Sequence, residues 1–455
     1  MTPRHLPEGF LLGCATAAHQ VEGAIDNDWT RWVAEHPEAI NGGGDAVIAI
    51  DHYRRYRDDL EQLGGMHHNA HRFSVEWARV EPKPGRFDRD ALAHYADVVR
   101  TCRRNGMEPV VTLHHFTLPV WLTESGGFGA PEAPIRFARY AAACVEALGG
   151  MVTWWVTINE PMVVAVLGYL EGVWPPGERS LGRTIVALRG LLRMHAAAAQ
   201  AIATVSAHHG WRAEVSIAHH ERRLVPRDAS SPMDRAVAKL PDFLFNRWFL
   251  RCCVAGRMLR PVGNGEVVPG LAGSLTYLGL NHYTSEAVSL DLGAPGSLFA
   301  RHEAVASLPL SSAGWAIDAG ALRRALGDLS QAFGLPILIT ENGVADEDDE
   351  LRPVYLRDHL DAVADAIDAG VDVRGYLYWT AWDNFEWAEG YTKRFGLFSV
   401  DRETQQRIAK PSAALFAEIC RTREVPEAED LDDTDPHPVA ALRPRAYHRE
   451  RGSSA

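Results

Sequence analysis

Short apolar runs and longer amphipathic segments alternate along the whole chain. Eight of the runs are rich in β-branched and aromatic residues, are bounded by Gly, Pro or polar residues, and are too short for helices, so they predict strands. These strands are expected at 10–16, 69–75, 109–115, 152–159, 214–219, 276–281, 336–340 and 374–380. Apolar residues at helical spacing predict helices at 51–63, 89–105, 134–148, 183–206, 234–253, 319–333, 353–369 and 410–421.

Strands that alternate with helices in this way predict an α/β fold, namely a single (β/α)8 TIM barrel with extended loops on its C-terminal face. A doubly wound open sheet is the alternative, but it would normally bring a GxGxxG turn, and the chain has none. Three longer stretches, at 22–50, 285–317 and 381–408, are expected to be irregular loops. They follow the first, sixth and eighth strands, at the face where a barrel builds its active site.

Composition divides the chain into two parts. Residues 1–421 are expected to form the barrel domain, whereas 422–455 run from acidic to basic with few apolar residues, which predicts a disordered tail. The N-terminus does not resemble a signal peptide, and no apolar stretch is long enough for a membrane span. The six cysteines include no CxxC, as is typical of thiols in a reducing compartment, so a cytoplasmic location is expected.

The charge balance narrows the range of partners. The net charge is 46 − 59 = −13, and hydrophobic residues make up 46% of the chain. An acidic protein lacks the basic face that nucleic acids and anionic membranes require, so neither is an expected partner.

Two motifs carry the candidate chemistry, TINEP at 157–161 and ITENG at 339–343. Each places a glutamate at the end of an apolar strand, Glu160 in the first and Glu341 in the second. A single glutamate there is more often a solvated rim residue or a neighbour of a helix cap. Two such glutamates, 341 − 160 = 181 residues apart, meet only in a closed or repeating fold, and two facing carboxylates are what cleavage of a glycosidic bond requires.

The ends of the other predicted strands supply amides, further charged groups and aromatic rings. Hydroxyl groups of a sugar need such donors and acceptors, and the C–H faces of its ring pack on tryptophan. The candidate residues are Gln20, Arg72, His114, His115, Asn159, Asn281, Tyr283, Trp379, Glu386 and Trp387.

From about residue 6 to 421 the chain resembles glycoside hydrolase family 1, the family of β-glucosidases and β-galactosidases. The resemblance rests on an ordered set of motifs: RFSVEWARVEP, TINEP, GLNHYTS, ITENG and DNFEWAEGYTKRFGLFSVD. It implies the (β/α)8 barrel and a retaining mechanism with two carboxyl groups about 5–5.5 Å apart.

Carried over to this sequence, the resemblance implies that Glu160 is the general acid/base and Glu341 the nucleophile. Arg72 and Tyr283 are expected to keep Glu341 ionised, while the apolar wall and the charge of Glu341 raise the pKa of Glu160. Gln20, His115, Asn159 and Glu386 would hold the sugar hydroxyls, Trp379 and Trp387 would form its floor and far edge, and Arg72, Asn281 and Tyr283 would surround the nucleophile.

The chain departs from the family's most frequent residues at Phe116 and His282, and from its phospho-sugar members on the eighth loop. Phe116 stands where the family most often has Trp, which removes an indole N–H from the sugar site, and His282 replaces the first residue of a frequent Tyr-Tyr pair while Tyr283 is kept. Members that act on phospho-sugars carry a Ser and a Lys/Tyr pair on the eighth loop. Here Glu386 precedes Trp387 and Phe395 replaces that Tyr, and a carboxylate there would repel a 6-phosphate.

No metal or cofactor is expected. Adjacent histidines at 67–68, 114–115, 208–209 and 219–220 could suggest a metal, but neighbours in a strand point to opposite faces, and no HExxH spacing occurs.

The sequence therefore predicts a retaining exo-β-glycosidase that acts on glucosides, galactosides or fucosides, with a small-molecule β-glycoside or oligosaccharide as its partner. A transglycosidase with the same intermediate, a catalytically silent sugar-binding protein and a homo-oligomer remain open.

Overall fold

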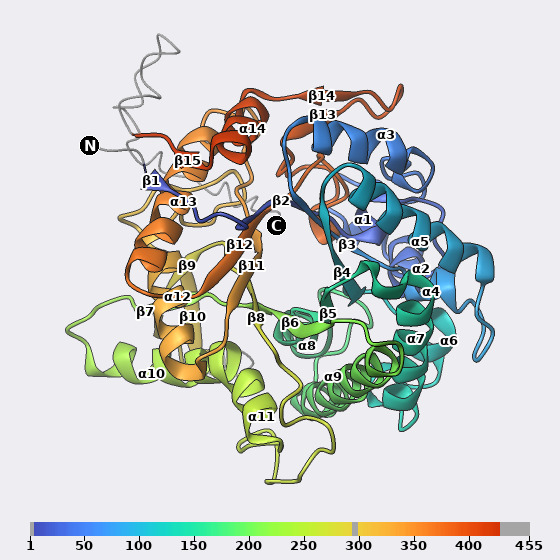
Figure 1. The fold of residues 1–455 in the computed structure, drawn as a ribbon. Helices are drawn as coiled ribbons and strands as arrows, with labels where there is room; N and C mark the ends of the chain where they lie inside the picture. Colours follow the sequence, from blue (N-terminus) through green and yellow to red (C-terminus); the bar gives the residue numbers. More distant parts are fainter. Residues whose placement is uncertain (1–3, 294–298, 428–455) are drawn as a thin grey trace, which may run out of the picture.

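The computed structural model describes residues 4–293 and 299–427, and its centre is a closed barrel of parallel strands (Figure 1). The last barrel strand pairs with the first, which closes the sheet. This architecture confirms the predicted (β/α)8 barrel. Around the barrel the strands are β2 (Leu11–Ala15), β3 (Ala70–Ser74), β4 (Glu108–His114), β5 (Trp154–Asn159), β6 (Glu214–His220), β8 (Leu278–Asn281), β11 (Ile337–Asn342) and β12 (Val373–Trp379).

Helices surround the barrel, and each long helix predicted from the sequence is present. The predicted helix at 234–253 is divided into α10 (Pro232–Asp242), a π-helix η5 (Phe243–Trp248) and α11 (Phe249–Ala255). The other long helices are α3 (His52–Gly65), α5 (Arg89–Arg104), α7 (Ala133–Leu148), α9 (Leu181–His209), α12 (Ala319–Phe333), α13 (Arg352–Asp368) and α14 (Pro411–Thr422). Short helices are α1 (Ala18–Val21), α2 (Asp28–Glu35), α4 (Trp77–Val80), α6 (Val120–Glu124), α8 (Pro161–Ala165) and the π-helix η4 (Val166–Leu170).

The barrel strands are buried almost throughout, because helices cover their outer faces and side chains fill the interior. This burial explains their nearly continuous apolar sequences. Strands β2 and β3 also approach closely at Gly13, where a Cβ atom would lie 1.8 Å from the carbonyl oxygen of Ala70. Only glycine fits at this position without a shift of one strand.

The three stretches that were predicted to be irregular contain regular structure, so that expectation is wrong in part. The first contains α2. The second contains β9 (Ser285–Leu290) and β10 (Ala300–Ala304), which form a small sheet with β7 (Arg223–Pro226). The third contains the antiparallel pair β13 (Phe398–Val400) and β14 (Arg407–Ala409). These strands are short and partly exposed, so they lack the apolar runs that identified the barrel strands.

The two ends of the described chain meet. Strand β1 (Arg4–His5) pairs with β15 (Glu424–Val425), and the Val425 side chain is buried. The ordered body thus continues beyond 421, and residues 428–455 of the expected tail lie outside the described residues.

In the described ranges, none of the helices has the length and apolar character needed to cross a lipid bilayer. All six cysteines are buried free thiols.

Candidate active site

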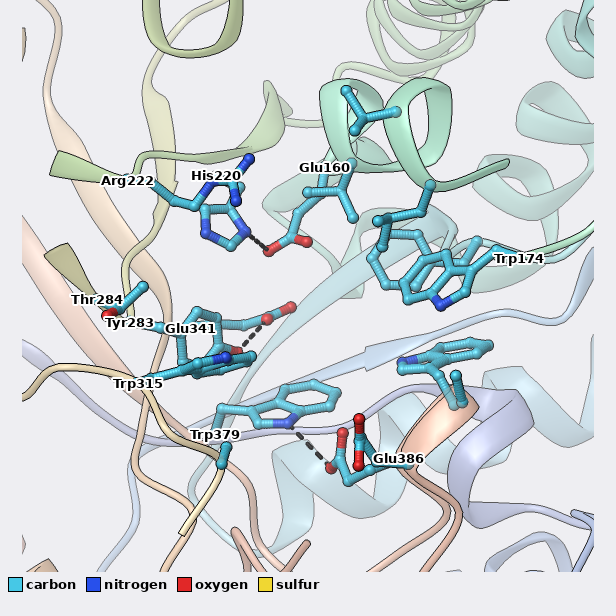
Figure 2. Close-up of a pocket in the computed structure, with 18 of the residues that line it drawn as sticks. Glu160, Trp174, His220, Arg222, Tyr283, Thr284, Trp315, Glu341, Trp379 and Glu386 are labelled. Atoms are coloured by element: carbon cyan, nitrogen blue, oxygen red, sulfur yellow. Dashed lines mark hydrogen bonds and ion pairs between the residues drawn. The ribbon is translucent and has the colours of Figure 1, made fainter. Parts of the chain in front are cut away.

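A cavity of about 370 Å³ lies at the carboxyl ends of the barrel strands, and both candidate glutamates line it (Figure 2). The predicted site residues on its wall are His115, Glu160, Tyr283, Glu341, Trp379, Glu386 and Trp387. Four other predicted residues are fully buried and contact wall or loop residues of the site: Gln20, Arg72, Asn159 and Asn281. His114, by contrast, packs against Phe128 and Phe137 and belongs to the core.

Glu341 is held by two donors at the end of β11. Arg72 Nη1 donates to Oε1 at 2.5 Å, and the Tyr283 hydroxyl donates to Oε2 at 2.6 Å. Arg72 comes from β3 on the other side of the barrel and is fully buried. Both carboxylate oxygens are therefore fixed in direction, as a nucleophile requires.

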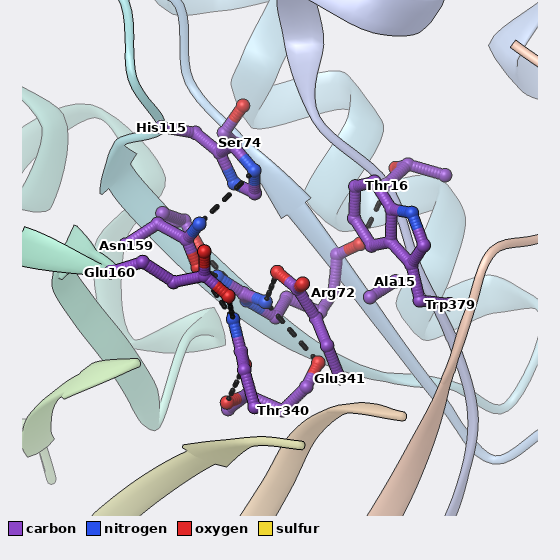
Figure 3. A network of polar contacts seen from close by, with 12 residues as sticks. Ala15, Thr16, Arg72, Ser74, His115, Asn159, Glu160, Thr340, Glu341 and Trp379 are labelled. Carbon is purple, nitrogen blue, oxygen red and sulfur yellow. Dashed lines mark hydrogen bonds and ion pairs between the residues drawn. The ribbon is translucent and has the colours of Figure 1, made fainter. Parts of the chain in front are cut away.

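Glu160 is the first residue after β5 and precedes α8. Asn281 Nδ2 donates to Glu160 Oε1 at 2.7 Å and to Asn159 Oδ1 at 3.1 Å. Thr340 in turn donates to the Asn281 amide oxygen at 2.7 Å. Figure 3 shows this network reaching Arg72, whose Nη2 donates to Asn159 Oδ1 at 2.8 Å. One buried polar network thus connects the two glutamates.

Three cavity residues adopt left-handed backbone conformations that non-glycine residues rarely occupy. They are Glu160 (φ +45°), Phe116 (φ +71°) and Trp387 (φ +53°). Such strain costs on the order of 1–3 kcal/mol per residue and is concentrated at functional sites. At Glu160 the strain accompanies a sharp turn from strand to helix that places the carboxyl group over the cavity.

The pKa values of the two glutamates are displaced in opposite directions. Burial and the negative charge of Glu160 raise the pKa of Glu341 to about 7, although Arg72 and Tyr283 oppose the rise. Burial would also raise the pKa of Glu160, but His220, Asn281 and Arg72 outweigh burial and lower it below its usual value. The two buried carboxyl groups interact, and the negative charge of one raises the pKa of the other. The raised pKa expected at Glu160 stays a prediction, which His220, a residue not included among the candidates, opposes.

Glu386 lies across the cavity from Glu160 (Figure 2). Its Oε1 accepts a hydrogen bond from the indole nitrogen of Trp379 at 3.3 Å. Burial raises the pKa of Glu386 to about 8, so its carboxyl group is mostly protonated at neutral pH. The expected repulsion of a 6-phosphate by a Glu386 carboxylate therefore applies only at higher pH. Gln20 donates through Nε2 to Asn384 Oδ1 and to the carbonyl of Phe385, and so holds the loop that carries Glu386.

Stacked rings form one side of the cavity. The His115 ring is nearly parallel to Trp379, at 5.7 Å between centroids, and to Trp387, at 6.1 Å. Phe116 meets the face of Trp387 edge-on at 5.0 Å. Flat apolar walls with a few polar groups at their edges fit a pyranose ring.

Several wall residues were not predicted. His220, at the end of β6, is the nearest to the candidate chemistry, because its Nδ1 lies 3.1 Å from Glu160 Oε1. Residues at the carboxyl ends of barrel strands converge on one site. The fifth barrel strand, β6, is the one for which the sequence analysis named no candidate, and the same rule applied there would have identified His220. Further unpredicted wall residues lie on loops, on the π-helix η5 and on strand β9, whose places around the barrel the sequence pattern does not give; among them are Trp174, Arg222, Phe245, Glu286 and Trp315.

In residues 4–293 and 299–427, no three His, Cys, Asp or Glu side chains are grouped as ligands for a metal ion.

Comparison with known proteins gives a consistent result. The model of glycosyl hydrolase family 1 matches residues 2–425. β-Glucosidase A of Thermotoga maritima is 32% identical over 449 residues, which cover 92% of this chain and 99% of that protein. A β-galactosidase of Sulfolobus acidocaldarius is 30% identical over 489 residues, with 92% of this chain and 96% of that protein covered.

Solved structures agree. The β-glycosidase from Pyrococcus horikoshii has a TM-score of 0.86 at 33% identity and covers 97% of this chain and 100% of its own. The family 1 β-glucosidase from Thermotoga maritima has a TM-score of 0.87 at 29% identity, with 94% and 100% covered. Over nearly its whole length, this chain is therefore a β-glycosidase that belongs to glycosyl hydrolase family 1.

Proposed function

We propose that the chain is a retaining exo-β-glycosidase that hydrolyses neutral β-glucosides, β-galactosides or β-fucosides, with Glu341 as nucleophile and Glu160 as acid/base. The observation that carries the proposal is the pair of buried glutamates on one cavity, each oriented by its own donors. The Thermotoga maritima β-glucosidase has been solved in complex with isofagomine lactam and with deoxynojirimycin, which supports a sugar in the corresponding cavity of this chain.

In the first step, a Glu341 carboxylate oxygen attacks the anomeric carbon of the sugar. The glycosidic bond breaks while Glu160 gives its proton to the departing oxygen, so the aglycone leaves as a neutral alcohol. The product is a covalent glycosyl ester on Glu341. Arg72 and Tyr283 direct the carboxylate and balance its charge before attack.

In the second step, Glu160 acts as a base. The ester has removed the negative charge of Glu341, so Glu160 takes a proton from water while the water oxygen attacks the anomeric carbon. The ester bond breaks, Glu341 is released as a carboxylate, and Glu160 again holds the proton. Two inversions give net retention of the anomeric configuration.

The residues around Glu386 favour an unphosphorylated sugar. Lys393 lines the cavity, but its Nζ donates to the carbonyl of Ser312 at 2.7 Å. Phe395 offers no hydroxyl to a phosphate, and Glu386 would meet a 6-phosphate with a carboxyl group. A panel of β-glycosides should therefore show higher kcat/KM for glucosides, galactosides or fucosides than for the 6-phosphates, and the reverse order would refute this substrate class.

Proton NMR of the first sugar released tests the stereochemistry. A β-glycoside should give the β-anomer first, followed by slow mutarotation. Initial release of the α-anomer would refute the retaining mechanism.

Chemical rescue tests the two roles. Glu341→Gly should lose hydrolysis and, with azide and an activated β-glucoside, should form the α-glucosyl azide, because azide enters the space of the lost carboxylate. Formation of the β-azide by this variant would instead assign Glu341 as the acid/base.

A further inference from the structure

His220 occupies a position next to the proposed acid/base. It ends strand β6, and its Nδ1 lies 3.1 Å from Glu160 Oε1. Figure 2 shows the two side chains facing each other at the cavity. The side chain is only 12% exposed, and its ring packs against Phe245 at 5.7 Å and Tyr283 at 5.8 Å between centroids. The backbone fixes the same pair, because the Glu160 N–H donates to the carbonyl of Ala218 on β6 at 2.8 Å.

No third group fixes the protonation of His220. Apart from the contact of Nδ1 with Glu160, neither ring nitrogen has a hydrogen-bond partner within the described residues. The Glu160 carboxyl group is the acidic side chain in contact with the ring. Other titratable groups around the pair are Arg72 and Glu341 on the Glu160 side, Tyr283 across the ring, and His219, Arg222 and His282 on the neighbouring strands and loop.

We propose that His220 is a positioning residue that shares the catalytic proton with Glu160, so that the two side chains titrate as one pair. The inference rests on the proposed role of Glu160. With one proton on the pair, the proton is either on Glu160, which can then protonate the leaving group, or on His220, which then faces a Glu160 carboxylate.

The proton balance across one turnover is closed. The pair enters the first step with one proton and gives it, through Glu160, to the glycosidic oxygen. It is then unprotonated, with a Glu160 carboxylate and a neutral imidazole. In the second step Glu160 takes one proton from the attacking water, and the pair returns to its first state without any further reactant.

The Glu160–His220 pair loses its last proton at a higher pH than Glu160 would without the imidazole, because that proton can reside on either side chain. Replacing the imidazole by a neutral amide should therefore move the alkaline limb of kcat/KM to lower pH. In His220→Asn we expect a downward shift of roughly one pH unit on an alkyl β-glucoside, a magnitude typical of a charged neighbour at this distance. At pH values far above the alkaline limb, kcat/KM of the unchanged protein and of His220→Asn should converge. The imidazole is then neutral, so protonation of Glu160 alone determines the fraction of reactive enzyme.

Three controls accompany the measurement. His220→Gln repeats the change with a different side-chain length, in case His220→Asn folds poorly. His219→Asn makes the same substitution at the neighbouring buried position of β6, where the side chain points to the other face. A 2,4-dinitrophenyl β-glucoside, whose leaving group needs no proton, should show no displacement of the limb in any variant.

The outcomes separate the possible roles. An unchanged limb in both His220 variants would mean that His220 only packs against its neighbours, and an upward shift would mean that it carries a permanent charge; either result overturns the proposal. Failure of the proposed function is visible separately: Glu160→Ala should lose activity on the alkyl glucoside far more than on the dinitrophenyl glucoside. If both activities fall equally, Glu160 is not the acid.

Discussion

Arg72 contacts both halves of the candidate site at the scale of single residues. Its Nη1 donates to the Glu341 carboxylate and its Nη2 to the Asn159 amide, which itself accepts from Asn281 beside Glu160. A movement of one glutamate would therefore change the contacts of the other. The rigidity of the pair follows from burial of this whole network below the cavity.

Tyr283→Phe should move the acid limb of kcat/KM to higher pH. Glu341 must be ionised to attack, and the Tyr283 hydroxyl bond to Oε2 lowers its pKa. Without the hydroxyl, the pKa of Glu341 rises, so activity is lost at a higher pH as the solution is acidified. A uniform loss of rate with no displacement of the acid limb would contradict this role.

Glu386→Ala should lower kcat/KM for a β-glucoside by about 10- to 100-fold, the equivalent of one strong hydrogen bond to a hydroxyl. The loss should be smaller for a β-xyloside, which has no O6. Glu386→Gln should retain more activity at neutral pH than Glu386→Ala, because the native carboxyl, with a pKa raised to about 8, is largely neutral there as well. Equal losses on the two sugars would show that Glu386 does not contact O6.

Most site residues were predictable from their place directly after a strand-like run, as at Glu160, Asn281 and Glu341. The same rule extended to the fifth strand would have included His220. The pKa shifts of the glutamates were not predictable, because they depend on which side chains face each carboxyl group. No pattern along the chain gives that information.

At the scale of elements, a buried ion cluster attaches the β13–β14 hairpin to the barrel. Arg407 on β14 donates to both carboxylate oxygens of Asp59 on α3, at 2.8 and 2.9 Å, and to the carbonyl of Ile50. His52 Nδ1 lies 2.7 Å from Asp59 Oδ2. The loop after the eighth strand, which carries Glu386, is thereby fixed to a helix from the start of the chain.

Asp59→Asn should lower the free energy of unfolding by about 3–5 kcal/mol, because it leaves Arg407 buried without its counter-ion. The exposed neighbour Asp58 supplies the control, since Asp58→Asn should have little effect. Burial alone would raise the pKa of Asp59, but His52 and Arg407 lower it below its usual value. The stabilisation is therefore full above the unfolded pKa of about 4 and is lost as the pH falls through the folded pKa.

Urea unfolding of Asp59→Asn and the unchanged protein at several pH values measures both effects. The difference in stability should narrow as the pH falls below about 4. A difference that stays constant, or one no larger than that of Asp58→Asn, would contradict the assigned role of the cluster.

The long elements were predictable because burial of one face leaves a clear periodicity. The division of the helix expected at 234–253 was not, because a π-helix of one turn, Phe243–Trp248, keeps a helical spacing of apolar residues. Strands β9, β10, β13 and β14 were missed because they pair at the edge of the molecule and bury few side chains.

At the scale of the whole molecule, hydrogen bonds connect the N-terminal and C-terminal segments of the described chain. Leu6 N–H donates to the carbonyl of Arg423 at 2.9 Å, and the Arg423 guanidinium donates to the carbonyls of Pro7 and Phe10. Removal of residues 428–455 should leave kcat and the Tm unchanged, because their composition does not support a core. Removal of residues 423–455 should lower the Tm by a few degrees, since it also deletes β15 and the buried Val425.

Calorimetry of the two truncated proteins distinguishes these cases. A large drop for the shorter deletion would show that residues 428–455 dock on the barrel. Equal Tm values for both deletions would show that the β1–β15 pair does not contribute to stability.

Closure of the barrel by β2 and β12 has a consequence for biosynthesis. Leu11 on β2 is in register with Gly375 on β12. Strand β2 is therefore synthesised long before β12, one of the two strands with which it pairs in the barrel. At about 5–20 residues per second, roughly 20–75 s separate the two. Throughout that time the nascent chain presents two unpaired strand edges, and Arg72 is made without its partner Glu341. The closed barrel, and with it the contact between Arg72 and Glu341, can therefore form only after the last barrel strand has been synthesised.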